Sequence, residues 1–377
     1  MQFSFSDDQE QFRSVIQRFL TDKSPTTEVR RLMETPEGYD PAVWKQLSEE
    51  LALPGIHIPE AYGGAGFGPV ELGIVMEEFG RSLLCAPFFS TSVLAAHAIL
   101  NAADEAQKAD LLPDLASGQR TAALAVTEPN GRWDALGIEL TATAAEHGEF
   151  LLKGTKSFVL DGNTADLLIV AARSPTSTGD DGVSLFAIPG GATGIDRRLL
   201  ESMDATRKIS LIEFDNARGQ LLGKLGAGAP ALSRTMDQAA IALANEMIGG
   251  AQALMDSAVD YAKLRMQFGR TIGSFQAIKH KCADMLLEVE LAKSAVYYAA
   301  QAAADNDPEL PALASLAKAS AADAYINTAA TCIQLHGGIG FTWDHDTHLW
   351  FKRAKSSEVF LGDPSYHREL YMQRIAA

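Results

Sequence analysis

Short β-prone runs interrupt a chain that is otherwise patterned as helix. Between Gln119 and Gly223 the apolar segments are brief and are separated by Gly, Asp, Asn and Pro. This spacing is typical of antiparallel strands joined by turns, because βαβ units would place a helix between successive strands. The sequence therefore predicts an antiparallel β domain built from the runs TAALAVT, FLLKGTKSFVL, DLLIVAAR, VSLFAIP and KISLIEFDN.

Helical patterns lie on both sides of this region. The segment SDDQEQFRSVIQRFL begins with Ser6 and has Gln9 three residues later, which is the capping-box pattern of a helix start. Its apolar residues then recur at helical spacing, as they do in PAVWKQLSEELAL, VELGIVMEEFGRSL and STSVLAAHAILNAA. After Gly223 the chain is Ala-rich helix almost to its end, with interruptions expected near FGRTIGS, DNDPELP and HGGIGFTWD.

The order of these patterns predicts an α+β fold with three domains. We expect an N-terminal α-helical domain over residues 1–118, a middle β domain over 119–224 and a C-terminal α-helical bundle over 225–377. A chain of 377 residues is long enough for two or three domains.

Composition excludes several classes of protein. The formal net charge is −16, so the basic surface that nucleic-acid binding requires is missing in bulk. The three cysteines are scattered and show no zinc or disulfide spacing, which favours a reducing compartment. No apolar run is long enough for a membrane helix, and the start MQFSFSDDQE lacks the regions of a signal peptide. We therefore expect a cytoplasmic protein without membrane insertion.

Two glycine-containing segments in the last third are candidates for binding phosphate. In QLHGGIGFT, three glycines follow a long helical stretch, and glycine lets a phosphate approach the backbone closely. RMQFGRTIGSFQ carries two arginines, which offer forked donors to phosphate. The alternative is that the glycines cap a helix and the arginines lie on a solvated helix end. Spacing alone leaves both interpretations open.

Common catalytic signatures are missing. The sequence has no G-x-S-x-G, H-E-x-x-H, Walker loop or Rossmann fingerprint. His345 and His348 stand three residues apart in WDHDTHLW, a segment expected to be helical. Asp344 and Asp346 lie nearby, but no Cys or Glu companion stands at matching spacing. We therefore expect no metal site, and we interpret this segment as a polar helix start.

The chain resembles the acyl-CoA dehydrogenase flavoproteins over essentially its whole length. The matching segments occur in the family's order and include IPEAYGGAGF, VMEEFGRSL, ALAVTEP, RMQFGRTIGSFQAIKHKCADM and QLHGGIGFT. The resemblance is strongest to small subunits of heteromeric acyl-CoA dehydrogenases of the pimeloyl-CoA or steroid-degrading type. It implies helical, β and four-helix-bundle domains assembled as a homo- or heterotetramer.

The resemblance also implies an FAD cofactor shared between subunits. In this family the Gln and glycines of QLHGGIG contact the adenosine and pyrophosphate end of an FAD held mainly by a neighbouring subunit. Residues of the RMQFG segment lie at the same end, and those of TEP and of the strand after the lysine lie near the flavin ring. The cofactor-binding candidates are thus Arg265, Phe268, Gln276, Gln334, Gly337, Gly338, Thr127 and Phe158.

The chain departs from the family pattern at positions that usually contact the flavin ring or supply the catalytic base. The segment TEPNGRWDAL lacks the A-G-S-D that usually follows TEP in this family. Leu160 replaces a hydroxyl residue that faces flavin N5, and leucine cannot donate a hydrogen bond. Leu361 stands at the usual position of the catalytic Glu, and Ala239 and Ala240 stand at the position used in a second branch of the family.

Three carboxylates remain near the missing base positions. Asp363 is the first candidate for a substitute base, Glu246 the second, and Glu358 precedes the same loop as Asp363. The alternative for each is an acid at a helix end or on the surface.

Three functions follow from this resemblance. The first is an FAD-dependent acyl-CoA dehydrogenase that desaturates an acyl-CoA thioester, with electron-transfer flavoprotein as acceptor. The second is a structural, FAD-supporting subunit of an α2β2 complex that has no active site of its own. The third is a related flavin oxidase or monooxygenase, which needs no α-carbon base.

Overall fold

A computed structural model describes residues 5–376, and the chain divides into two units that are taken one at a time. The helical unit contains the described parts of Met1–Arg30, Pro69–Leu84 and Ala240–Ala377; the sheet unit contains Arg31–Gly68 and Cys85–Ala239. Residues 1–4 lie outside the described part of the chain. They begin the segment MQFSFSDDQE, which was predicted not to be a signal peptide. The three predicted domain limits stay predictions.

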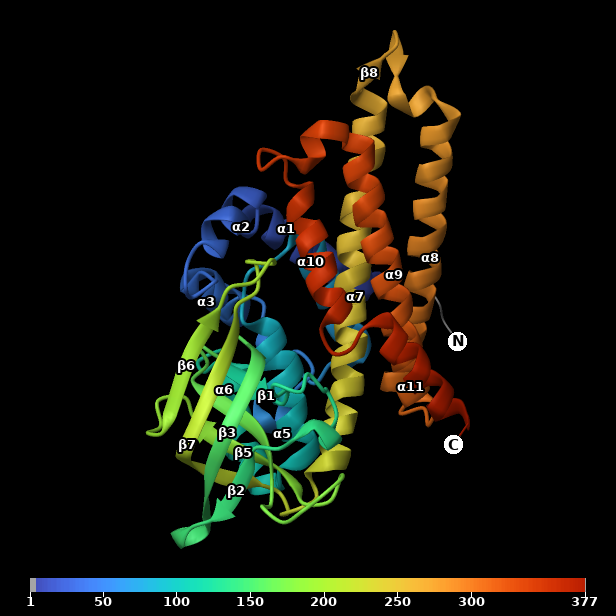
Figure 1. The fold of residues 1–377 in the computed structure, drawn as a ribbon. Helices are drawn as coiled ribbons and strands as arrows, with labels where there is room; N and C mark the ends of the chain where they lie inside the picture. Colours follow the sequence, from blue (N-terminus) through green and yellow to red (C-terminus); the bar gives the residue numbers. More distant parts are fainter. Residues whose placement is uncertain (1–4, 377) are drawn as a thin grey trace. The chain divides into compact units, whose positions relative to one another are not determined.

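All five predicted β runs form strands of one sheet in the sheet unit (Figure 1). Two further strands, β2 and β6, were not predicted, because β2 contains only Thr and Ala and β6 is half-polar, with half of its residues exposed. The strands are β1 (Ala122–Ala125), β2 (Thr141–Ala144), β3 (Glu149–Leu160), β4 (Leu167–Arg173), β5 (Val183–Pro189), β6 (Ile195–Leu200) and β7 (Ile209–Leu222).

The sheet closes on itself. Its strand order is β1-β4-β2-β3-β7-β5. An additional pairing between β4 and β5 closes the strands from β4 to β5 into a ring. Most pairs are antiparallel as predicted, but β1 and β4 run parallel to each other, as do β2 and β4 at a single residue pair. Strands β4 and β5 are buried along almost their whole length, and Phe186 and Leu152 belong to the apolar cluster inside the sheet.

Several helices of the sheet unit precede the sheet in sequence. They include α3 (Pro41–Glu49), α5 (Ala96–Ala102) and α6 (Glu105–Ala116). The segment predicted as one helix around STSVLAAHAIL begins as a π-helix, Phe89–Ala95, in which every residue is buried. Wide helical turns of this kind are rare and often occur near functional sites.

Long helices make up the helical unit, with a hairpin between two of them (Figure 1). Helix α9 contacts α8, α10 and α11, and α4 contacts α1 and α8. The three predicted interruptions of the last third all occur. The helices are α1 (Asp7–Lys23), α4 (Pro69–Ser82), α7 (Gly228–Leu264, from Ala240 onward in this unit), α8 (Gln276–Ala304), α9 (Leu310–His336), α10 (Thr347–Val359) and α11 (Pro364–Ala376).

Two glycines explain how closely α4 and α7 approach each other. A Cβ on Gly80 would collide with the backbone oxygen of Glu246, and a Cβ on Gly249 would collide with that of Glu77. The capping box predicted at Ser6 and Gln9 is present at the start of α1. No helix among residues 5–376 is long and apolar enough to cross a bilayer.

Candidate cofactor site

The glycine run at the end of α9 has two different explanations. Gly337 ends the helix with φ 68°, a conformation that favours glycine, and its N–H donates to the carbonyl oxygens of Gln334 and Ile333. Gly338 has no positive φ, and a Cβ placed on it would meet nothing within 4 Å. Helix capping therefore accounts for Gly337, whereas no backbone strain or close neighbour in the chain accounts for Gly338.

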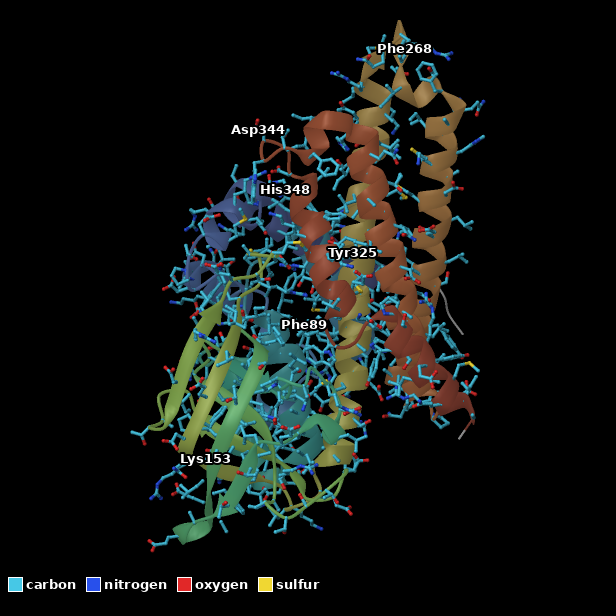
Figure 2. The ribbon with its side chains drawn as sticks, viewed as in Figure 1. Phe89, Lys153, Phe268, Tyr325, Asp344 and His348 are labelled. Carbon is cyan, nitrogen blue, oxygen red and sulfur yellow. The ribbon has the colours of Figure 1, made fainter. Side chains whose placement is uncertain are left out.

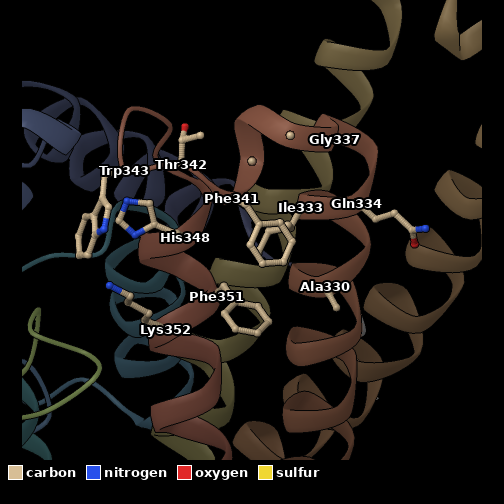
Figure 3. A pocket seen from close by; sticks show the side chains of 12 residues that line it. Ala330, Ile333, Gln334, Gly337, Phe341, Thr342, Trp343, His348, Phe351 and Lys352 are labelled. Atoms are coloured by element: carbon tan, nitrogen blue, oxygen red, sulfur yellow. The ribbon is translucent and has the colours of Figure 1, made fainter.

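A cavity of about 740 Å³ opens beside these glycines (Figure 3). Figure 3 shows Phe341, Phe351 and Ile333 on one side, with Trp343, His348 and Lys352 across from them. The cavity is in the size range of small-molecule and cofactor sites. Its lining is Ala330, Ile333, Gln334, Gly337, Gly338, Gly340, Phe341, Thr342, Trp343, His348, Phe351 and Lys352.

Three other predicted contacts of the adenosine end, Arg265, Phe268 and Gln276, lie outside this lining. Phe268 is 91% exposed on the turn between β8 (Met266–Gln267) and β9 (Arg270–Thr271), at φ 52° (Figure 2). Arg265 and Gln276 are exposed at the two ends of the segment that contains this hairpin and connects α7 to α8. Gln334 accepts a hydrogen bond from Lys281 Nζ at 3.3 Å, and Figure 3 shows its side chain pointing away from the aromatic residues.

In the sheet unit, a buried ion pair holds Thr127 and Phe158 in place. Lys156 Nζ lies 2.7 Å from Oε1 of Glu128 and also donates to the carbonyl of Val126, with the lysine side chain completely buried. Burial lowers the pKa of Lys156 to about 8. The N–H of Ser157 donates to the carbonyl of Thr127 at 2.8 Å, so the two predicted contact segments lie side by side.

Phe158 is presented by a distorted strand. The register of β3 against β7 shifts between Lys156 and Val159, and Phe158 lies at φ 55° with 48% of its surface exposed. A left-handed conformation costs a non-glycine residue roughly 1–2 kcal/mol. Such strain often occurs at functional positions, where it aims a side chain.

Both candidate bases have structural partners. Oδ1 of Asp363 accepts from the N–H of Tyr366 at 2.8 Å, so Asp363 caps the start of α11 while exposed to solvent. Glu246 is buried and pairs with Arg353 at 2.7 Å. The carboxylate of the third acid, Glu358, pairs with Lys355. These contacts match the alternative interpretation of each acid, and the catalytic assignments stay predictions.

Buried groups also fix the turn that carries Leu361. Lys318 Nζ donates to the carbonyl of Glu358 at 3.1 Å and to that of Gly362 at 3.0 Å, and His367 Nε2 lies 3.0 Å from the carbonyl of Leu361. Leu361 is 4% exposed at φ 62°. The turn is therefore held firmly with an apolar residue at its centre.

His345 and His348, which were considered as metal ligands, contact different residues. His345 precedes α10, so the prediction that its segment is helical was wrong there; its ring lies 4.5 Å from that of His336. His348 lies within α10, and its Nε2 is 3.2 Å from Arg30 Nη2. Among the residues that the structure describes, no three His, Cys, Asp or Glu side chains are grouped to hold a metal ion.

Comparison with known proteins identifies the family. Residues 6–119 match the acyl-CoA dehydrogenase N-terminal domain, residues 123–217 its middle domain and residues 226–376 its C-terminal domain. The chain belongs to the acyl-CoA dehydrogenase family. Members of this family are FAD-dependent oxidoreductases that act on the CH–CH bond of acyl-CoA thioesters.

Similar proteins cover nearly the whole chain. An acyl-CoA dehydrogenase of Bacillus subtilis is 34% identical over 347 residues, which are 89% of this chain and 90% of the relative. Acyl-CoA dehydrogenase IpdE2 of Mycobacterium tuberculosis is 31% identical over 358 residues, 95% of this chain and 94% of the relative. The structure of butyryl-CoA dehydrogenase from Megasphaera elsdenii superposes with a TM-score of 0.93 at 28% identity and covers 100% of both chains.

The residues present fit parts of an FAD molecule. Oγ1 of Thr127 is buried without a hydrogen-bond partner among the described residues, so a ligand atom can satisfy it. The open space at Gly338 allows close approach of a phosphate or sugar. Thr127 and Gly338 belong to different units, and each fits the cofactor by its own surroundings.

The sequence reasoning missed the aromatic lining of the cavity. Phe341 and Trp343 directly follow the glycine run, and Lys352 lies one helical turn after His348. An aromatic pair next to glycines at a helix end was the available signal, since large exposed apolar side chains need a partner.

Proposed function

We propose that this chain works in an α2β2 assembly with a second acyl-CoA dehydrogenase chain. In that assembly it binds the adenosine end of FAD and does not supply the catalytic base. The observation that carries the proposal is burial of apolar side chains at both base positions of the family: Leu361 is 4% exposed and Ala239 is 0% exposed. Neither side chain can accept a proton.

The remaining carboxylates support this division of roles. Desaturation of an acyl-CoA removes a proton from the α-carbon, and a base must lie within about 3 Å of that proton. Asp363 caps a helix and Glu246 is neutralised by Arg353, so each carboxylate already has a structural contact. FAD, when bound, accepts the hydride that leaves the β-carbon. The base then comes from the partner chain.

What this chain retains is suited to the distal end of the cofactor. The cavity beside Gly337 and Gly338 is open, and Arg265 and Phe268 are exposed on the hairpin. In the proposed assembly these residues contact the FAD held by the partner, and the tetramer carries about two flavins instead of four.

The substrate and acceptor follow from family membership. We propose an acyl-CoA thioester as substrate and electron-transfer flavoprotein as acceptor, with the enzyme in the cytoplasm. Cys85, Cys282 and Cys332 form no disulfide bond with one another, which agrees with a reducing compartment.

Anaerobic reduction of the flavin tests the proposal. The chain expressed alone is expected to be flavin-poor and not to be reduced by acyl-CoA esters. Co-expression with an acyl-CoA dehydrogenase chain that carries the base is expected to give a yellow complex whose flavin bleaches with substrate. Substrate-dependent bleaching by the chain alone would refute the division of roles. Oxygen consumption without an acceptor would identify the oxidase or monooxygenase alternative.

A further inference from the structure

A second hollow lies in the helical unit, apart from the cavity beside the glycine run. Its volume is about 320 Å³, and none of its lining residues belongs to the lining of that cavity. The lining comes from the start of α2 (Thr26–Met33), from α7, from the turn before α10 and from α10 itself. We call it the Trp350 hollow. Its residues are Thr26, Ala253, Leu254, Ser257, Asp344, His345, Asp346, Thr347 and Trp350.

One hydrogen-bond donor at the Trp350 hollow has no partner within the chain. Nε1 of Trp350 is buried and makes no hydrogen bond to any of residues 5–376. An indole N–H can only donate, and a buried donor without an acceptor costs free energy. The hydroxyl groups of Thr26 and Ser257 belong to the same lining. A bound molecule that offers oxygen atoms therefore removes the cost of the unpaired indole N–H.

A carboxylate gives the Trp350 hollow a negative charge. Oδ1 of Asp346 lies 2.8 Å from Nη2 of Arg30, so the charges of this pair compensate each other. Asp344 lies exposed on the turn before α10 (Figure 2), and it has no ion-pair partner in the described part of the chain. The lining thus offers a carboxylate acceptor that disfavours an anionic ligand.

The segment that carries these groups is held in place before a ligand binds. Arg30 Nη2 also donates to the carbonyl of His345 at 3.2 Å, and the N–H of Thr347 donates to Nδ1 of His345 at 3.3 Å. The hydroxyl of Thr347 donates to the carbonyl of Gly340 at 3.2 Å. Polar groups that are fixed in this way lower the entropic cost of binding.

The combination of these groups selects a molecule with several hydroxyl groups. A hydroxyl can accept from the indole N–H of Trp350 and can donate to the carboxylate of Asp344. A metal ion or an ammonium group has no acceptor for Trp350, and a sulfate ion has no donor for Asp344. Ala253 and Leu254 add an apolar wall, which suits the C–H groups of a polyol.

We propose that the Trp350 hollow binds a small polyol of about monosaccharide size. One of its oxygens accepts from Trp350 Nε1, and one of its hydroxyls donates to Asp344. Trp343, which lines the cofactor cavity, directly precedes Asp344 in the chain. A bound polyol therefore braces the turn that carries part of that cavity. The site goes beyond the proposed function, because it contains no residue assigned to FAD or to catalysis.

Saturation-transfer NMR with D-glucose tests the site on the full-length chain. Glucose is expected to bind the wild type. Trp350→Phe keeps an aromatic ring but loses the N–H, so it should weaken binding about three- to ten-fold. Asp344→Ala should have an effect of similar size, whereas Asp344→Asn keeps an acceptor oxygen and should retain most of the affinity.

Trp343→Phe is the matched control. It also removes an indole N–H, but at the neighbouring cavity, and should bind glucose like the wild type. Thermal unfolding shows whether each variant is folded. If Trp350→Phe does not fold, Ser257→Ala removes a lining hydroxyl from a different helix and should weaken binding to a similar degree. No binding by the wild type, or equal affinities of the wild type and all lining variants, would overturn the proposal.

Two further measurements test the ligand class and the bracing of the turn. Displacement of glucose by glycine or sulfate at concentrations below that of glucose would overturn the assignment to a polyol. Hydrogen exchange of the backbone amides of residues 341–347 should slow when glucose binds the wild type, and it should slow less in Trp350→Phe at the same glucose concentration. Glucose binding that leaves this exchange unchanged in the wild type would show that the polyol does not brace the turn.

Discussion

Arg353 Nη1 lies 2.7 Å from Oε1 of Glu246, and both side chains are at most 5% exposed. This pair joins α7 to α10 inside the helical unit. Breaking a buried pair leaves one charge without compensation, whereas replacing both partners with apolar groups can be neutral. The pair therefore makes Glu246 part of the core and unsuited to exchange protons with a substrate.

Glu246→Gln should lower the free energy of unfolding by about 3–5 kcal/mol. Chemical denaturation of the assembled protein measures this loss. The double variant Glu246→Gln with Arg353→Met should recover much of it, because no uncompensated charge remains. If Glu246→Gln left stability unchanged but abolished flavin reduction, Glu246 would be the base after all.

Substitutions at Asp363 distinguish a helix cap from a base. Asn caps helices as well as Asp does, so Asp363→Asn should be nearly neutral for both stability and flavin reduction. Asp363→Ala should cost about 1 kcal/mol of stability and leave the reduction rate of the complex unchanged. Stopped-flow reduction and thermal unfolding of the two variants provide the comparison. A loss of several orders of magnitude in Asp363→Asn would assign catalysis to this residue.

Lys156→Met should destabilise the sheet unit. The substitution leaves the buried Glu128 carboxylate without its cation, at an expected cost of about 3–5 kcal/mol. Lys153→Met, at a 69% exposed side chain on the same strand, is the matched control and should be nearly neutral. Equal unfolding midpoints for the two variants would contradict the role given to the buried pair.

Acid should destabilise the sheet unit through a buried histidine pair. The rings of His57 and His97 stack 4.4 Å apart, and burial, together with the charge of Arg234, lowers the pKa of His97 to about 4. The unfolded chain therefore takes up a proton near pH 6.5, before the folded chain does, so stability falls as pH drops from about 6.5 to about 4.

The His97 contribution to this fall should be about 3 kcal/mol at most. Urea unfolding at several pH values measures it. His97→Gln keeps a donor for the Val93 carbonyl and should flatten the pH dependence in this window, apart from the share due to His57. An unchanged slope in the variant would show that His97 does not titrate as described.

Local sequence rules predicted helix ends correctly where residues close in the sequence determine the structure. The capping box at Ser6 and the glycine cap at Gly337 are set by neighbouring residues, and both are present. Strand β6 was missed because its residues are half-polar, and its position depends on pairing with β7.

Contacts between distant residues could not be predicted from the sequence. The partners of Glu246 and Lys156 lie 107 and 28 residues away, and only folding brings each pair together. The cavity beside Gly337 likewise depends on the turn after α9, which carries Phe341 and Trp343 into its lining. Sequence patterns therefore located the glycines but not the aromatic side chains that line the cavity beside them.

Native mass spectrometry with a flavin count tests the central claim most directly. It is applied to the chain expressed alone and to its complex with a base-carrying acyl-CoA dehydrogenase chain. We predict little or no FAD on the chain alone and a complex of two chains of each kind with about two FAD. A stable homotetramer with four FAD, whose flavin is reduced by an acyl-CoA ester, would contradict the account.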